Sequence, residues 1–561
     1  MGFKDKFRNL NECRINSAIY DAYYNKDINE KIVYVESRNG FDFAGNMFRI
    51  VEELSTGDYG DFRIYVFAHS HVKPKIEDFM KSHNLKIYEI ITSPDRASEI
   101  LHTAKYIFTD SGIRYKYVKK PGQIFVNTWH GTIMKLMGID NNHERLTMGI
   151  IQRSLLFSDY LIFPSDYLKE RLLNSFMLDG IYPGKMLLEG YPRNSVFLDD
   201  GRRDELKNEF GLQDFEIFIY MPTFKGLVDD RKNEKQKDDV DKFLGEIDEN
   251  LKDSQILFAK LHPYNTQKID FSRFDHIKPF PNGFEIYDIV NMADCLITDY
   301  SSVFFDFANT RRKIIIFNYD EEEYLKDRGL YFPLSDLPFP KVQSVSDLMS
   351  EMNSPKDYDD TEFIEKFCQY ERMEAAKYIC EAIFKNDNSS QLEMIENGKP
   401  NVLLYAGDFS DKGTVDSLNG FVERIDTTRY NLFVSFCPWM KNIKENPQDI
   451  FKDIPQNIGF LPFSYNLMPT VREKLKYNQL SGNSQYDDSL KRFFKRTFEQ
   501  QYGNLKFEHI IDFDADDLER ALIFDNACDS FHLFSKSESK VEGIIDEDCI
   551  IRDLDALSKL L

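Results

Sequence analysis

Short apolar runs alternate with amphipathic stretches along the first two thirds of the chain. Residues 31–35, 63–67, 85–91 and 106–109 are rich in Val, Ile, Tyr and Phe, as expected of buried strands. Stretches with helical spacing, such as 46–54, separate these runs. The alternation predicts a doubly wound α/β fold with a parallel sheet, which binds ligands outside the carboxyl ends of its strands.

The stretch 291–324 predicts a strand, a turn, a helix and a second strand in close succession. Its turn places Ser301 and Ser302 at the start of the helix, where unpaired N–H groups and the helix dipole favour an anion such as phosphate. Asp306 follows Ser302 by four residues, so it lies on the same helix face and could reach a ribose hydroxyl. The alternative is a serine-capped helix that binds no ligand.

Two histidines come directly after predicted strands. His130 follows the apolar run 123–127 in the sequence Trp-His-Gly-Thr, and a histidine that titrates near neutrality could remove a proton from a hydroxyl. Gly131 would let a substrate approach the backbone closely. His262 ends the run 256–261. If the two sheets face each other, both rings lie in one cleft, and the alternative for His130 is a hydrogen bond within the core.

A turn at 190–194 ends the first half of this pattern. The charged residues 198–208 then precede a new apolar run at 217–221, which is followed by Thr223. Arg193 in the turn carries a fixed, fork-shaped guanidinium that suits a phosphate. The alternative is that Arg193 only pairs with a carboxylate.

Length and charge exclude several classes of protein. A chain of 561 residues is too long for one core, so about three domains are expected. The net charge of −23 argues against a nucleic-acid partner, so local basic groups must hold any phosphorylated ligand. The seven cysteines form no CxxC pair, which indicates neither a zinc site nor a disulfide framework and favours a reducing cytoplasm. No run of eighteen apolar residues predicts a membrane span.

Five motifs occur in a fixed order along the chain. They are WHGT (129–132), GYPRN (190–194), MPTFK (221–225), KLHP (260–263) and DCLITDYSSVFFDFA (294–308). Together they resemble the CDP-glycerol glycerophosphotransferase family, which comprises teichoic-acid primases and polymerases and related capsule enzymes. The resemblance covers residues 31–384. It departs from the family at Ile133, where proline is frequent, and at Lys225, where arginine is common, and both changes concern substrate detail.

The resemblance implies two facing Rossmann-like domains of the glycosyltransferase B type, with the active site between them. It implies transfer of a polyol phosphate from a CDP-polyol to a hydroxyl of a lipid-linked or polymeric acceptor, with release of CMP and no required metal or other cofactor. On the matching positions, His130 is the expected base and His262 the expected support of the pyrophosphate. The expected donor-binding residues are Trp129, Gly131, Thr132, Ile133, Arg193, Pro222, Thr223, Lys260, Leu261, Ser301, Ser302 and Asp306.

These patterns divide the chain into five parts. The predicted parts are an amphipathic segment (1–30), an acceptor domain (31–200), a CDP-polyol-binding domain (201–385), a polar linker (386–399) and a further α/β domain (400–561). The last part resembles, more weakly, the amino-terminal half of sugar-nucleotide glycosyltransferases.

Two amphipathic helices are candidates for contact with an anionic membrane surface. In the first, Phe3, Phe7 and Leu10 share a face that cations flank. In the second, Leu490 and three phenylalanines within 490–498 share a face beside Lys and Arg, which suits an anionic lipid or a polyphosphate acceptor. The alternatives are a solvated first helix and phenylalanines packed in the core of the last domain. We expect a peripheral enzyme at the cytoplasmic face of the cell membrane.

The predicted function is that of a polyol-phosphate transferase in the synthesis of a cell-wall or capsule polymer. One rival is a nucleotide-sugar glycosyltransferase, because that class uses the same architecture. The second rival is a non-catalytic module that binds an anionic polymer, with two structural histidines. The sequence leaves open whether the polyol is glycerol or ribitol, whether one unit or many are added, and the oligomeric state.

Overall fold

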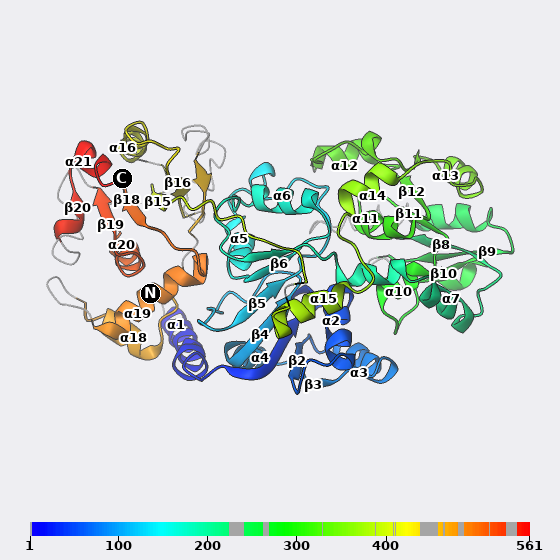
Figure 1. Ribbon diagram of the computed structural model, residues 1–561, viewed down its shortest axis with the longest axis horizontal. Helices are drawn as coiled ribbons and strands as arrows, with labels where there is room; N and C mark the ends of the chain where they lie inside the picture. The colour runs from blue at the N-terminus through cyan, green and yellow to red at the C-terminus, as the bar shows by residue number, and fades with distance from the viewer. Residues whose placement is uncertain are drawn as a thin grey trace.

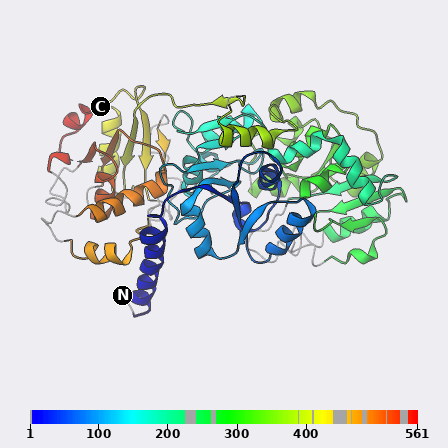
Figure 2. The ribbon, with the colours of Figure 1, turned by 60° about the horizontal axis from the view of Figure 1, so that its bottom comes forward.

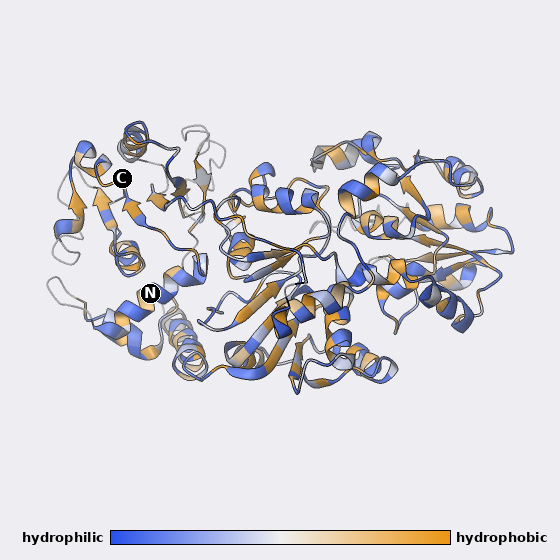
Figure 3. Cartoon of the chain, in the orientation of Figure 1, coloured by the Kyte–Doolittle hydropathy of each residue, from blue (hydrophilic) through white to orange (hydrophobic). Residues whose placement is uncertain are grey.

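The computed structural model describes residues 3–223, 240–261, 269–327, 329–387, 389–407, 409, 411–437, 458–463, 466–480, 487–514, 517–534 and 547–561. Three sheets follow one another along the long axis of the molecule, and helices surround each sheet (Figure 1). The strands of all three are hydrophobic, whereas the helices over them are hydrophilic along one side (Figure 3). Two Rossmann-like units and a third α/β unit confirm the predicted fold class.

The first sheet has eight strands in the order β14-β7-β6-β5-β4-β1-β2-β3. The strand order reverses between β1 and β4, and at such a switch point a doubly wound sheet opens for a ligand. Glu36, Thr109 and Asn127 lie side by side, so β1, β4 and β5 end at the same level. The elements are β1 (Asn29–Glu36), β2 (Arg63–Phe67), β3 (Ile87–Ile91), β4 (Ala104–Thr109), β5 (Ile124–Asn127), β6 (Tyr160–Ile162), β7 (Lys185–Leu187), β14 (Leu392–Glu393), α2 (Gly45–Thr56), α3 (Lys73–Ser82), α4 (Pro94–Thr103), α5 (Gly149–Leu156) and α6 (Asp166–Ser175).

The second sheet has six strands in the order β10-β9-β8-β11-β12-β13, with its switch point between β8 and β11. The stretch 291–324 forms β11, α11 and β12 as predicted, and every residue of both strands is buried. The elements are β8 (Glu216–Tyr220), β9 (Gln255–Ala259), β10 (Ile277–Pro279), β11 (Cys295–Thr298), β12 (Lys313–Phe317), β13 (Lys341–Val342), α7 (Asp200–Glu209), α10 (Ile286–Asn291), α11 (Val303–Phe307), α12 (Glu321–Asp327), α13 (Val345–Met352) and α14 (Thr361–Phe367).

The third sheet has the strand order of the second, β17-β16-β15-β18-β19-β20. The three phenylalanines predicted as a lipid-binding face, Phe493, Phe494 and Phe498, are at most 5% exposed, because this face of α19 packs into the core of the domain. The elements are β15 (Asn401–Tyr405), β16 (Asn431–Ser435), β17 (Gly459–Phe460), β18 (His509–Asp512), β19 (Phe531–Phe534), β20 (Ile550–Ile551), α16 (Lys412–Val422), α18 (Val471–Tyr477), α19 (Asp488–Tyr502), α20 (Leu518–Asp525) and α21 (Leu554–Ser558).

The chain returns to the first sheet before it enters the third. The helices α15 (Ala375–Cys380) and η8 (Glu381–Lys385) pack into one core with α2 and β1, although the sequence assigned them to the second domain. Next, β14 pairs antiparallel with β7, and Leu392 lies opposite Leu187. The linker predicted at 386–399 therefore contains a strand of the first sheet.

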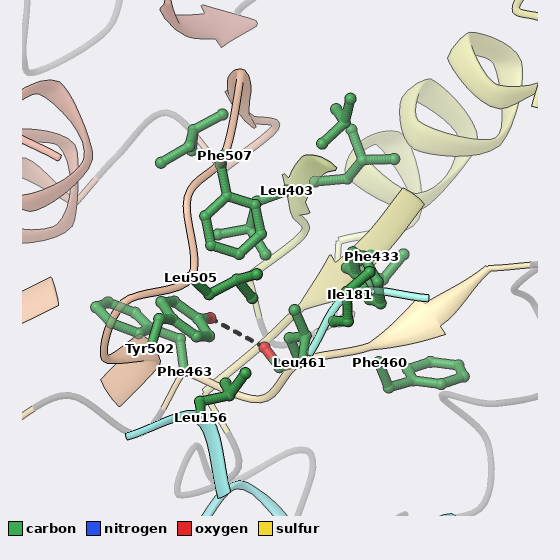
Figure 4. Packing of buried hydrophobic residues seen from close by; sticks show 14 of the residues in the cluster. Leu156, Ile181, Leu403, Phe433, Phe460, Leu461, Phe463, Tyr502, Leu505 and Phe507 are labelled. Atoms are coloured by element: carbon green, nitrogen blue, oxygen red, sulfur yellow. Dashed lines mark hydrogen bonds between the residues drawn. The ribbon is translucent and has the colours of Figure 1, made fainter. Parts of the chain in front are cut away.

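The third domain shares a continuous hydrophobic core with the first. Leu156 and Ile181 of the first domain lie among Leu461, Phe463 and Tyr502 of the third, and the Tyr502 hydroxyl donates to the Leu461 carbonyl oxygen at 3.0 Å (Figure 4). A core that crosses the boundary in this way holds the two domains in one relative position.

The amino-terminal helices lie beside the third domain. In Figure 2, α1 (Phe3–Asn16) extends next to α18. The Asn16 side chain donates to the Pro469 carbonyl oxygen at 3.2 Å, and the Val471 N–H donates to the Ser17 hydroxyl at 3.0 Å. The predicted amphipathic segment thus bridges the first and third domains. Across the described ranges, no helix is both long enough and apolar enough to cross a membrane.

Arg153 of α5 is one of several polar links at this boundary. Its buried guanidinium donates to the carbonyl oxygens of Ile113, Tyr115 and Tyr117 in the first domain and of Gln500 in the third. We expect Arg153→Ala to cost about 3 kcal/mol or more, because several buried carbonyls lose their donor.

The expected measurement is a drop of several degrees in the apparent Tm by differential scanning fluorimetry. Arg63→Ala is the matched control, since Arg63 is half-buried and lies against the Tyr88 ring at the start of β2. Equal melting curves for Arg153→Ala and the control would contradict the assigned role.

Candidate active site

Arg193 joins the first and second halves of the molecule through a buried ion pair. It lies in η4 (Pro192–Leu198), and its Nε and Nη2 donate to the Asp306 carboxylate of α11 at 3.0 to 3.2 Å. Its Nη1 donates to the His130 carbonyl oxygen at 3.0 Å, and its N–H donates to the Asn46 side chain at 3.1 Å. Burial acts against the charge, yet the Asp306 carboxylate raises the pKa of Arg193. Arg193 thus fixes three loops against one another.

His130 follows β5 on a loop with a strained backbone. Trp129 has a φ of 55°, in the left-handed region that favours glycine, and its ring centroid lies 4.2 Å from that of His130. Nδ1 of His130 lies 3.0 Å from the Asp110 carbonyl oxygen, which can only accept, so Nδ1 carries the proton and Nε2 keeps its lone pair. The residue is exposed, but desolvation by the surrounding protein lowers the pKa of His130. The ring is therefore a neutral base at neutral pH.

The loop of His130 touches the second half at Gly131. Gly131 has a φ of 151°, and a Cβ at this position would lie 2.9 Å from the Ser302 Oγ. Glycine is needed here because Ser302 of the second half lies close to this part of the backbone. The sequence had instead predicted that a substrate would approach at this point. Further along, the Leu136 N–H donates to the Gly329 carbonyl oxygen at 3.0 Å, which is a second contact between the halves.

The predicted phosphate-binding turn lies at the switch point of the second sheet. Asp299, after β11, accepts a hydrogen bond at 2.7 Å from the backbone N–H of Thr223, which follows β8. Ser301 and Ser302 come next and are half-buried, and neither hydroxyl bonds to another described residue. Ser302 makes no side-chain cap on α11, so the capping alternative is not observed. Both hydroxyls remain available to a ligand.

Lys260 follows β9 and is half-buried. Burial lowers the pKa of Lys260, the Asp42 carboxylate opposes that change, and the cations Lys75 and Arg38 lower the pKa further. Asp42, Lys75 and Arg38 all belong to the first half. The Lys260 ammonium therefore lies close to charged groups of the first half.

Several of the predicted donor-binding residues make contacts within the protein, and their roles toward a donor stay predictions. The Asp306 carboxylate pairs with Arg193, which is the carboxylate contact that the sequence left open for Arg193. Trp129, Ile133 and Leu261 are buried in hydrophobic clusters, where they position the backbone.

Some of the other predicted residues lie within the described structure and some lie outside it. Thr132 is buried in the loop of His130, and Pro222 is half-buried at the end of β8. His262 and Lys225 lie outside the described residues, so their roles stay predictions. The expectation that no metal or other cofactor is required also stays a prediction.

Three polar residues of the first half complete the cleft and escaped the sequence analysis. Asn46 starts α2 and binds Arg193 and the Thr128 hydroxyl, Asp110 follows β4 and holds His130, and Arg38 follows β1. The sequence could have indicated Arg38 and Asp110 by their position, because both come directly after predicted strands at the first switch point.

The site lies where two Rossmann-like units meet. One unit contributes a neutral histidine and the other contributes free hydroxyls. This arrangement defines a transferase of the glycosyltransferase B type. The chain belongs to the CDP-glycerol:poly(glycerophosphate) glycerophosphotransferase family, whose profile matches residues 18–385. It is accordingly an enzyme of the CDP-glycerol glycerophosphotransferase type.

Relatives and solved structures agree with this assignment. A teichoic acid poly(glycerol phosphate) polymerase of Bacillus spizizenii is 26% identical over 401 residues, which cover 67% of this chain and 98% of the relative. A teichoic acid glycerol-phosphate transferase of Staphylococcus aureus is 27% identical over 395 residues, 66% of this chain and 98% of the relative. A structure of the wall teichoic acid polymerase TagF has a TM-score of 0.57 at 22% identity, covers 68% of this chain and 97% of its own, and supports the fold.

Glu371 gives the site region a pH dependence. Its half-buried carboxylate accepts hydrogen bonds from the Tyr191 N–H at 2.9 Å and the Asn194 side chain at 2.6 Å. Burial raises the pKa of Glu371 from 4.5 to about 8. Between these values the folded protein holds a proton that the unfolded chain releases, so the free energy of unfolding falls as the pH rises through this window.

We expect Glu371→Gln to remove this part of the pH dependence. Between pH of about 5 and about 8, the apparent Tm should fall less for the variant than for the wild type. The control is Glu374→Gln, because Glu374 is exposed and its ion pair with Lys377 lies on the surface. Parallel curves of Tm against pH for Glu371→Gln and the wild type would contradict the prediction.

Proposed function

We propose that the enzyme transfers glycerol phosphate from CDP-glycerol to the terminal hydroxyl of a lipid-linked acceptor or of a growing teichoic-acid or capsule polymer. The observation that carries this proposal is the contact of Gly131 with Ser302, which brings the base His130 next to two free hydroxyls. The glycerol-phosphate enzymes among the relatives support the choice of donor. A poly(ribitol-phosphate) polymerase of Bacillus spizizenii is 25% identical over 364 residues, so ribitol is the alternative to test.

In this proposal the acceptor hydroxyl loses its proton to His130 Nε2 while its oxygen attacks the β-phosphorus of CDP-glycerol. A new bond forms between that oxygen and the phosphorus, the bond from the phosphorus to the bridging oxygen breaks, and CMP leaves with the electron pair. Such a transfer needs mainly positioning and charge stabilisation. Asp110 keeps the proton on Nδ1, so Nε2 is the nitrogen that can accept.

The donor lies at the switch point of the second sheet in this proposal. Ser301 and Ser302 bind the pyrophosphate, because their hydroxyls lack another partner in the described structure. Lys260 adds positive charge from the end of β9, and Thr223 borders the same strand ends. His262 is assigned to the pyrophosphate by the family resemblance alone.

Donor and base can be tested in one assay. We expect CMP release from CDP-glycerol in the presence of a short lipid-like acceptor, and slower release from CDP-ribitol. His130→Ala should lower the rate by about 10² to 10⁴, the usual contribution of a general base, while CDP-glycerol binding is retained.

The control is His143→Ala, an exposed histidine in the loop after the motif, which should behave like the wild type. Consumption of UDP-sugars without CMP release would replace the proposal by a glycosyltransferase. Full activity of His130→Ala would refute the assignment of the base.

We also place the enzyme at the cytoplasmic face of the cell membrane as a peripheral protein. The helix α1, which carries the exposed residues Leu10 and Ile15, packs against α18, which carries the exposed Leu475. The helix α18 in turn packs against α19, which carries the exposed cations Lys491 and Lys495. Apolar side chains among cations suit an anionic lipid surface, and these cations stand out in a chain of net charge −23.

We expect the protein to sediment with vesicles that contain anionic lipid and to remain in solution with zwitterionic vesicles. Leu475→Glu should reduce binding, because the change removes an apolar contact and adds a repelled charge. Met394→Glu is the matched control, since Met394 is equally exposed beside β14. Equal binding of both variants would contradict the assigned surface.

A further inference from the structure

A strained turn follows β1 at the switch point of the first sheet. Arg38 and Asn39 have φ values of 46° and 54°, and Gly40 has a φ of 81°. The left-handed region costs a non-glycine residue about 1 to 2 kcal/mol, so two such residues in succession need contacts that hold them. Asp110 provides these contacts, because its carboxylate accepts from the Ser37 hydroxyl at 2.8 Å and from the Arg38 N–H at 2.7 Å.

Asp110 holds the proposed base as well. Its carbonyl oxygen lies 3.0 Å from His130 Nδ1. Since β1, β4 and β5 end in register, the loops that carry Arg38, Asp110 and His130 all start at one level of the sheet. One buried residue therefore positions both the turn of Arg38 and the ring of His130.

The side chain of Arg38 is exposed, and it has no ion pair or hydrogen bond with any described residue. The nearby Asp42 carboxylate is paired with Lys75 at 2.7 Å. In addition to burial, the charge of Arg38 lowers the pKa of His130 in the first half and of Lys260 in the second. The guanidinium thus lies where groups of both halves sense its charge.

We propose that Arg38 binds the phosphoryl group during its transfer, from the side of the cleft opposite to Ser301 and Ser302. The proposal rests on the proposed function and adds a catalytic residue to it. Negative charge gathers on the non-bridging oxygens as the acceptor oxygen approaches the phosphorus. A guanidinium can donate two parallel N–H bonds to two such oxygens, and a preorganised donor of this kind stabilises the transition state.

Arg38→Asn and Arg38→Lys test the proposal. Asparagine tolerates the left-handed backbone, and lysine keeps the charge without the fork. We expect kcat/KM for CMP release to fall by about 100-fold or more in Arg38→Asn, with the larger part of the loss in kcat. Arg38→Lys should recover about tenfold of that loss. The matched control Arg63→Ala, at the amino end of the neighbouring strand β2, should behave like the wild type.

The pH profile separates a catalytic from a merely structural role. The charges that face the His130 ring are those of Asp110, Arg193 and Arg38. Removal of the Arg38 charge raises the pKa of His130, so the acidic limb of kcat/KM should move to higher pH in Arg38→Asn and stay in place in Arg38→Lys. If Arg38→Asn changes the Tm but leaves the acidic limb of kcat/KM at the pH of the wild type, the proposal is overturned.

Binding of inorganic pyrophosphate, measured by calorimetry, does not require turnover. We expect Arg38→Asn to weaken it by about tenfold or more and Arg63→Ala to leave it unchanged. A wild-type protein that binds pyrophosphate through Arg38 yet releases no CMP would overturn the proposed function and retain the anion site. Activity of Arg38→Asn within about threefold of the wild type, or unchanged pyrophosphate affinity, would overturn the role of Arg38.

Discussion

The arrangement of the cleft depends on the buried ion pair between Arg193 and Asp306. Taking two charges out of water is costly, and a buried ion pair often stabilises a fold no more than well-packed apolar side chains would. What this pair provides is geometry, because the planar fork of Arg193 holds the Asp306 carboxylate with two nitrogens and the His130 carbonyl with the third. His130, the proposed base, is thereby fixed against the turn that carries Ser302.

Strain is concentrated on the first half of this cleft. Trp129, Arg38 and Asn39 all take left-handed backbone conformations directly after strands of the first sheet. Such strain persists only where surrounding contacts over-determine it. Here the Asn127 side chain accepts from the Trp129 N–H at 2.8 Å, and the Asp110 carboxylate accepts from the Arg38 N–H. Contacts within the protein hold these loops, which is the condition for electrostatic preorganisation.

The strands and the region of the site could be predicted from the sequence, because buried parallel strands are continuous apolar runs and ligands bind at their carboxyl ends. The residue with which a polar side chain forms a hydrogen bond or ion pair could not be predicted in this way. Local spacing placed Asp306 on one helix face with Ser302, yet its carboxylate meets Arg193, 113 residues away in the chain. The spacing of 490–498 predicted an apolar face but not that the core of the domain covers it. A strand of two residues, such as β14, is too short to show the alternation of apolar and polar residues that predicts a strand.

The third sheet repeats the strand order of the second, yet its own side chains occupy its switch point within the described residues. The fully buried Arg520 pairs with Asp512, at the end of β18, at 2.8 Å and with Asp514 at 3.1 Å. A Cβ on Gly407, after β15, would lie 2.7 Å from the Asp514 carboxylate. The same position that offers free hydroxyls in the second sheet is therefore closed by an ion-pair cluster here. The core of this domain continues instead to Trp129, so the domain supports the loop of His130 through packing.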